Sequence, residues 1–144
     1  MNPTICELLD TADRLVADDG GPASNGLHSI KAGAAVSGPP TVLTATVASR
    51  CRGAAFALRA ALESAVTARL TEHGAPHVIR RGNMRAALLW LRGCTEAGTA
   101  RRAKAAWSQL CLGCHYHQYE IGPTQDQVRA WRGEVAALVA LLAR

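Results

Sequence analysis

The feature that most constrains the fold of this chain is a long run of apolar residues at helical spacing. After Pro39-Pro40, apolar side chains recur every three or four residues, which is typical of one face of an α-helix. We expect this helix to reach about His73-Gly74, a length of about 30 residues or about 45 Å. Gly53 is its weak point, because glycine disfavours a helix interior. The apolar stripe comprises Leu43, Val47, Cys51, Ala55, Leu58, Leu62, Val66 and Leu70.

Further helices follow the long one. Pro76 breaks it, and the next apolar periodicity predicts a helix over residues 84–91. The loop Gly93–Gly98 then leads to another helix, which we expect to end at Gly122-Pro123. Its apolar positions are Ala103, Trp107, Leu110, Cys111 and Cys114. Alanine and leucine dominate while aromatic residues make up only 4% of the chain, and this composition favours packed helices over sheets.

The last helix is the best marked. Thr124 and Gln127 form a capping box, in which each side chain bonds a free backbone amide of the first turn. The predicted fold class is therefore all-α: an up-and-down helical bundle of four main helices over residues 41–144, preceded by an N-terminal helix and a flexible linker. The buried stripe of the last helix is expected to comprise Val128, Trp131, Val135, Leu138, Val139 and Leu142.

The first 40 residues resemble an arm. Asn2-Pro3 is a good helix start, and apolar residues at helical spacing predict an amphipathic helix over residues 1–18. Residues 19–40 are rich in glycine and proline, which indicates a linker. The N-terminal helix can dock either on its own domain or on a partner.

The chain offers no membrane segment and no export signal. No window approaches about 18 unbroken apolar residues, and the first twenty residues carry five acidic side chains against Arg14 alone. We therefore expect a cytoplasmic protein that does not bind a membrane. The five cysteines are expected to be free thiols, because an odd number in a reducing compartment does not suit a disulfide framework.

Two metal or cofactor patterns need to be weighed. Cys111-Leu-Gly-Cys114-His115 matches covalent c-type haem attachment, which normally follows export. His73 and His77 could join the two cysteines as zinc ligands, but a glycine and a proline break the helix between these histidines. We therefore predict no metal and no cofactor, and expect Cys111 and Cys114 to belong to the buried stripe of their helix.

Positive charge is concentrated between Ile79 and Lys104. This stretch has seven cations and one carboxylate, a net charge of +6 against +5 for the whole chain. A patch of this density would attract phosphates. Alternatively, the arginines only solvate the outer faces of two helices. The candidate phosphate-binding residues are Arg80, Arg81, Arg85, Arg101 and Arg102.

The run His115-Tyr116-His117-Gln118-Tyr119-Glu120 places six polar or half-polar groups at the end of a buried helix. These side chains could cap the helix end and bond the following loop, or form a polar layer in a dimer interface. They could equally bind a ligand or carry catalysis. His115 and Tyr119 share one helix face, on the side of Lys104 and Ser108.

Several short segments together look like the HEPN superfamily, and most closely resemble the uncharacterised HEPN-like proteins of actinobacteria. They are Leu58–Val66, Trp107–Leu110, His115–Thr124 and Trp131. The resemblance covers roughly residues 50–144 and leaves the N-terminal arm unexplained. It implies an up-and-down helical bundle that commonly dimerises. Many members of the superfamily are metal-independent ribonucleases of toxin–antitoxin and phage-defence systems, and others are inactive binding or scaffold domains.

The catalytic signature of that family is an arginine, four to six residues, and a histidine that often continues as His-x-Tyr. His117-Gln118-Tyr119 fits the second part, and His115 is the other candidate histidine. By resemblance, the arginine binds the scissile phosphate and the histidine is the general acid or base on the ribose 2′-hydroxyl. No arginine stands at positions 108–112, where the signature requires it. A neighbouring helix could supply Arg59, Arg85 or Arg102.

The resemblance implies a function in defence or in a toxin–antitoxin system. We expect a homodimer that binds RNA or a nucleotide through the basic stretch and through His115, His117 and Tyr119. If it is an enzyme, it is a metal-independent ribonuclease of degenerate type. Its partner would be an antitoxin or a nucleotidyltransferase, and the latter would modify Tyr119. The alternative is a non-catalytic scaffold that docks a protein partner through its bundle and N-terminal helix.

Overall fold

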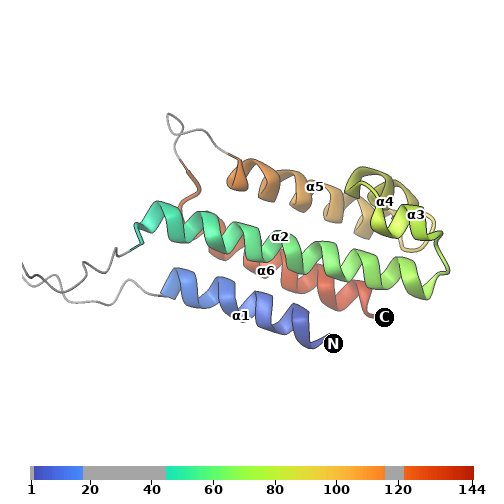
Figure 1. The fold of residues 1–144 in the computed structure, drawn as a ribbon, viewed down its shortest axis with the longest axis horizontal. Helices are drawn as coiled ribbons and strands as arrows, with labels where there is room; N and C mark the ends of the chain where they lie inside the picture. The colour runs from blue at the N-terminus through green and yellow to red at the C-terminus, as the bar shows by residue number, and fades with distance from the viewer. Residues whose placement is uncertain (1, 18–44, 116–121) are drawn as a thin grey trace, which may run out of the picture.

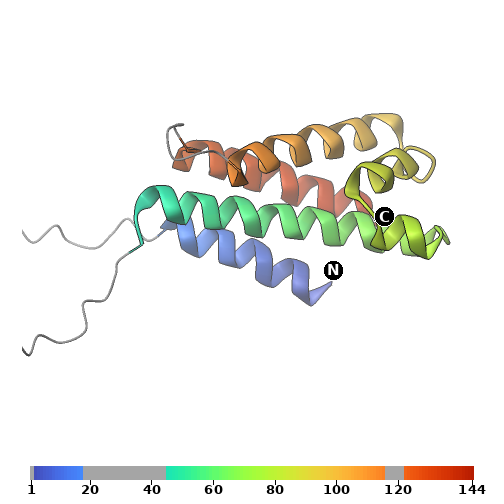
Figure 2. The same cartoon turned by 45° about the horizontal axis from the view of Figure 1, so that its top comes forward.

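The computed structural model describes residues 2–17, 45–115 and 122–144, and every regular element in these ranges is an α-helix (Figure 1). Long helices run in alternate directions, and the start of α1 lies at the same end of the bundle as the end of α6 (Figures 1 and 2). This confirms the predicted all-α, up-and-down bundle with an N-terminal helix, while the predicted linker falls outside the described residues. The helices are α1 (Pro3–Ala17), α2 (Val47–Glu72), α3 (His77–Arg81), α4 (Met84–Leu91), α5 (Ala97–Cys114) and α6 (Gln125–Leu142).

Side chains cap the helix starts that the sequence marked most clearly. In α6, Thr124 Oγ1 accepts from the Gln127 N–H at 3.2 Å, and Gln127 Oε1 accepts from the Thr124 N–H at 2.9 Å. This reciprocal pair confirms the predicted capping box. Asn2 Oδ1 accepts from the Thr4 N–H at 3.0 Å, immediately ahead of Pro3, so the predicted start of α1 is also confirmed.

The helix α2 begins later than predicted. Ala45 and Thr46 are not helical, and the helix starts at Val47. The hydroxyl of Thr46 accepts from the Ser49 N–H at 3.2 Å, and this bond satisfies one of the free amides of the first turn. A capping threonine inside an apolar periodicity therefore sets the boundary, rather than the two prolines before it.

The helix α5 ends earlier than predicted. The expected continuation to Gly122-Pro123 is wrong, because α5 ends at Cys114 and His115 is its C-cap. The N–H of His115 donates to the carbonyls of Cys111 at 3.1 Å and Leu112 at 3.3 Å, which tightens the last turn. Cys114 is buried while His115 is exposed, so among the described residues the buried face of α5 reaches no further than Cys114. Residues 116–121 lie outside the described ranges.

The break after α2 contains a short helix that was not predicted. Gly74 adopts a positive φ of 66°, a backbone conformation that favours glycine, and so ends α2 after His73. The helix α3 follows directly on Pro76. Its position is fixed by Arg80, whose Nε donates to the carbonyl of Ala75 at 2.9 Å.

The N-terminal helix docks on its own domain. The helix α1 packs along α2 and against α6, and its buried residues Ile5, Leu9, Ala12 and Val16 belong to the main core. A Cβ atom at Gly53 would lie 3.2 Å from Cδ1 of Leu15. The glycine that weakens α2 thus permits the close approach of α1.

The cysteines are free, as predicted, and Cys114 is buried while Cys111 is only half-buried. In the part of the chain that the structure describes, no helix is long and apolar enough to cross a membrane.

Candidate functional site

An arginine of α2 meets the histidine at the end of α5. Arg59 donates from Nη1 to Nε2 of His115 at 3.2 Å. A guanidinium can only donate, so Nε2 accepts, and the neutral imidazole carries its proton on Nδ1. His115 is exposed, whereas the Arg59 side chain retains 24% of its accessible surface. Of the three arginines that the sequence left open, Arg59 is therefore the one that reaches His115.

Aromatic and acidic neighbours orient the guanidinium of Arg59. Its Cζ atom lies 5.3 Å from the centre of the Phe56 ring, and Phe56 meets the His115 ring edge-on at 6.2 Å between centroids. On the other side, Nε of Arg59 lies 3.4 Å from Oε1 of Glu63. The same oxygen accepts from Nε1 of Trp107 at 2.9 Å. These contacts restrain the guanidinium from several directions, so that it presents Nη1 to the histidine.

Two thiols lie close to this pair. Burial raises the pKa of the Cys111 thiol, and the neighbouring Arg59 opposes part of that shift. Burial also raises the pKa of the Cys114 thiol. Both thiols therefore stay protonated near neutral pH, and neither is prepared to act as a thiolate nucleophile.

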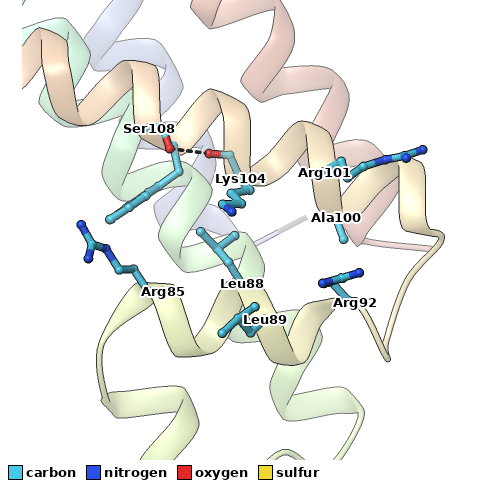
Figure 3. Close-up of a pocket in the computed structure, with 9 residues that line it drawn as sticks. Arg85, Leu88, Leu89, Arg92, Ala100, Arg101, Lys104 and Ser108 are labelled. Atoms are coloured by element: carbon cyan, nitrogen blue, oxygen red, sulfur yellow. Dashed lines mark hydrogen bonds between the residues drawn. The ribbon is translucent and has the colours of Figure 1, made fainter.

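A groove of about 650 Å³ lies between α4 and α5 (Figure 3). Leu88 is buried at its base, while Leu89 is exposed beside it. In Figure 3, Arg85 lies at one end of the groove and Arg92 lies at the other. None of the described residues that line it is acidic. The lining comprises Arg85, Leu88, Leu89, Arg92, Ala100, Arg101, Lys104, Trp107 and Ser108.

The predicted phosphate-binding arginines are not gathered in one place. Arg85 and Arg101 line the groove. Arg102 instead forms two bonds of 2.9 Å with a carboxylate of α6, and Arg80 donates to a backbone carbonyl ahead of α3. Arg81 is exposed on α3 and is not among the residues that line the groove.

Of the predicted catalytic residues, the structure describes His115 alone. His117 and Tyr119 lie outside the described residues. Arg92 and Lys104 belong to the charged stretch but were not singled out from the sequence, and both line the groove.

We found no match to the chain among protein-family models, curated proteins or solved structures. The chemistry of the site must therefore be argued from its own residues. It combines a fixed cation with a histidine, the side-chain type that exchanges a proton near neutral pH. Such a pair is suited to reactions in which a proton moves while negative charge develops nearby.

The four candidate zinc ligands of the sequence all lie in the part of the chain that the structure describes. Within residues 2–17, 45–115 and 122–144, no three His, Cys, Asp or Glu side chains form a group that could hold a metal ion. His73 and His77 thus form no such group with Cys111 and Cys114.

Three residues of the site were not singled out from the sequence. Phe56 and Glu63 lie three and four positions from Arg59, and this spacing was a signal that they share its face of the helix. Trp107 lies eight positions before His115, on a neighbouring part of α5. Which face of α2 meets α5 follows from the packing of the two helices, and no local pattern reveals it.

Proposed function

We propose that the protein is a HEPN-like helical domain that binds RNA or a nucleotide and cleaves RNA without a metal ion. The observation that carries this proposal is the 3.2 Å hydrogen bond between Arg59 and His115. The resemblance lacked an arginine ahead of either candidate histidine, and Arg59 offers a guanidinium from another helix to one of them, His115. The all-α, up-and-down bundle also supports the assignment.

In this proposal, a phosphodiester of RNA lies beside the pair. Arg59 turns its donors to a non-bridging phosphate oxygen, and this frees Nε2 of His115 to accept the proton of the 2′-hydroxyl. The 2′-oxygen then attacks phosphorus, the bond to the 5′-oxygen breaks, and the leaving oxygen takes up a proton from water, while His115 later releases the proton it accepted to solvent. The products are a 2′,3′-cyclic phosphate and a 5′-hydroxyl. Arg59 stabilises the charge that develops on phosphorus.

The proposed biological setting follows from the resemblance. The protein would act as a homodimer in a toxin–antitoxin or phage-defence system, with an antitoxin or nucleotidyltransferase as partner. Tyr119 would be the residue that such a nucleotidyltransferase modifies. The groove between α4 and α5 supports the binding part of the proposal, because its cations suit a phosphate chain.

The experiment is cleavage of total RNA by the purified protein in the presence of a metal chelator. We expect wild-type cleavage that leaves 2′,3′-cyclic phosphate ends. His115→Ala and Arg59→Ala should each lower the rate about 100-fold or more, because a general base or a charge-stabilising donor contributes at least that much. His117→Ala tests the other candidate histidine in parallel.

A matched control is His73→Ala, which removes an exposed histidine at the far end of α2. Arg129→Ala, which removes a surface arginine of α6, serves in the same way for Arg59. Circular dichroism must show that each variant is folded. Equal rates in wild type, His115→Ala and Arg59→Ala, or a wild type that cleaves nothing, would remove the catalytic part of the proposal.

A second candidate is a protein-interaction module. Val78 and Leu112 favour it, because they leave 72% and 75% of their surface exposed. The apolar face of α1 is already packed on the bundle, so a partner would have to dock on these other residues. This candidate predicts an inactive wild type whose association state changes in Val78→Ser or Leu112→Ser, measured by light scattering.

A further inference from the structure

The groove between α4 and α5 carries four cations with no carboxylate against them. Arg85, Arg92, Arg101 and Lys104 all line it, and none forms an ion pair with another described residue. In contrast, Arg102 on the neighbouring face of α5 is paired with Glu134. Because no described carboxylate neutralises it, the positive charge of the groove suits an anionic ligand.

The base of the groove is apolar. Leu88 is buried there, and Leu89 leaves 62% of its surface exposed. Trp107 lines the same groove and is half-buried. An inorganic anion or a bare phosphate chain would leave this apolar surface unused. A ligand that fits the whole groove must combine flat apolar groups with repeated negative charge.

The face of α5 that lines the groove leads toward the Arg59–His115 pair. Arg101, Lys104, Ser108, Cys111 and His115 follow one another at steps of three and four residues, so they lie along one face of α5. His115 lies 14 positions after Arg101, which is about 21 Å along a helix. A stacked nucleic-acid strand advances about 3.4 Å per nucleotide, so this face can accommodate several consecutive nucleotides.

Two observations connect the groove with the Arg59–His115 pair. The indole of Trp107, which lines the groove, donates to the carboxylate of Glu63 that also faces Arg59. In Figure 3, Arg85 and Ser108 lie on the same side of the groove, opposite Arg92 and Arg101, and Ser108 is the groove residue that comes closest to His115 along α5. The end of the groove at Arg85 is thus the end nearer to the pair.

We infer that this groove binds unpaired nucleotides of a single-stranded RNA. A base lies against Leu89 and Trp107, and the neighbouring phosphates contact the four cations. The strand then leads to the phosphodiester at His115. The inference rests on the proposed function for its choice of RNA as ligand. Duplex RNA does not fit the apolar base, because its bases are stacked and paired and only its backbone and groove edges are accessible.

The test is binding of a fluorescently labelled, 2′-O-methylated oligonucleotide, which cannot be cleaved through its 2′-oxygen. Fluorescence anisotropy should show that the single strand binds at least about tenfold more tightly than a duplex of the same sequence, since stacking of one base is worth about that factor. The logarithm of affinity should fall with the logarithm of salt concentration with a slope of about −3, because each phosphate contact on a single strand contributes about −0.7.

Charge variants locate the site. The double substitution Arg85→Ala and Lys104→Ala should reduce the steepness of the salt dependence by about 1.4, the value for two phosphate contacts. The matched control is Arg14→Ala with Arg129→Ala, which removes the same charge from α1 and α6. The control should leave the slope unchanged.

A second pair of variants tests the apolar base. Leu89→Ser should weaken binding about fourfold for each methylene taken out of contact, with no change in the salt slope. Leu112→Ser removes a similarly exposed leucine of α5 that does not line the groove, and should have no effect. Equal binding of duplex and single strand, competition by polyglutamate as strong as by RNA, or groove variants that match their controls would each overturn the inference.

The outcomes separate this inference from the proposed catalysis. If His115→Ala abolishes cleavage but binds the oligonucleotide normally, both stand. If the wild type cleaves nothing while binding shows the expected dependence on the groove, the catalytic proposal fails and the groove remains a single-strand site. If cleavage depends on His115 but the groove variants bind normally, the groove inference fails alone.

Discussion

Arg59 illustrates how one side chain can connect two helices. It extends from α2 with its cation over Phe56, its Nε beside Glu63 and its Nη1 on His115. Only a planar guanidinium offers donors in several fixed directions at once, which a lysine ammonium does not reproduce. The residue is therefore held beside His115 by its neighbours before any ligand arrives, and a cation already near the reacting phosphate is what the proposed reaction needs.

Gly113 shows the same dependence on a single residue in packing. A Cβ atom there would lie 2.8 Å from Cζ3 of Trp131, so Gly113→Ala forces the indole to move. We expect the free energy of unfolding to fall by about 1 kcal/mol, because overpacking costs about 1–3 kcal/mol and the better helix propensity of alanine returns up to about 1 kcal/mol. Urea denaturation followed by circular dichroism measures this.

The control for this prediction is Gly133→Ala in α6, where no atom lies within 4 Å of the added Cβ. This substitution should raise the free energy of unfolding by about 0.5–1 kcal/mol through helix propensity alone. The same glycine-to-alanine change is thus expected to lower the free energy of unfolding at Gly113 and to raise it at Gly133. A Gly113→Ala variant as stable as Gly133→Ala would show that Trp131 adjusts without cost.

At the scale of elements, α5 serves two purposes on different faces. One face attaches it to the bundle: Trp107 bonds Glu63 of α2, and Arg102 bonds Glu134 of α6. Another face carries the groove cations and leads to His115. The pairing of Arg102 within the fold leaves it unsuited to bind ligand, although it stands beside Arg101 in the sequence.

The ion pair between α5 and α6 makes stability depend on pH. A hydrogen bond from Arg102 lowers the pKa of Glu134, so the folded state binds a proton at this carboxyl less readily than the unfolded chain. The pair's contribution is therefore fully present above the ordinary glutamate pKa of about 4.3 and is lost as pH falls through the lowered value. We expect Glu134→Gln to melt about 1–3 °C below wild type at pH 7, a small effect because the pair is exposed.

Differential scanning calorimetry from pH 7 to pH 3 should show this difference shrinking toward zero. A double-mutant cycle with Arg102→Met is the control, because Glu134→Gln should have no further pH-dependent effect once the arginine is gone. A difference that persists unchanged at pH 3 would mean that Glu134 acts through packing and not through its charge.

At the scale of the whole molecule, α1 completes the bundle. It contributes Ile5, Leu9, Ala12 and Val16 to the main core, and Asp13 accepts from Arg132 of α6 at 2.7 Å. The up-and-down bundle in Figures 1 and 2 therefore consists of α1, α2, α5 and α6, while the short α3 and α4 form one end and one wall of the groove.

Deleting residues 1–18 should unfold or aggregate the protein. The three large buried side chains of α1 contribute about 1.5–3 kcal/mol each, and their sum approaches the total stability of about 5–15 kcal/mol of a typical domain. Thermal melts by circular dichroism, with dye binding to exposed apolar surface, measure the loss. Leu9→Ala should lower the free energy of unfolding by about 2–5 kcal/mol. The control Glu7→Ala changes an exposed residue of the same helix and should leave that free energy nearly unchanged. A truncated chain that melts like the full chain would contradict this account of α1.

Much of the fold could be predicted because its signals are local. The cap at Asn2, the capping box at Thr124, the breaks around Gly74 and Pro76, and the apolar stripes each depend on residues within a few positions of one another. The errors fell where two local signals compete. Thr46 caps α2 inside an apolar periodicity, and α5 ends at Cys114, the last buried residue of its face among those described.

The sequence by itself predicted that the regular elements are helices, that the last of them begins at the Thr124 capping box, and that the basic charge lies between Ile79 and Lys104, because periodicity, composition and capping act over short distances along the chain. Only the tertiary structure decided that Arg59 meets His115, 56 positions away, that Arg102 is paired and that four other cations surround one groove. These outcomes depend on which helix faces become buried together, and that choice is made by the packing of the whole bundle.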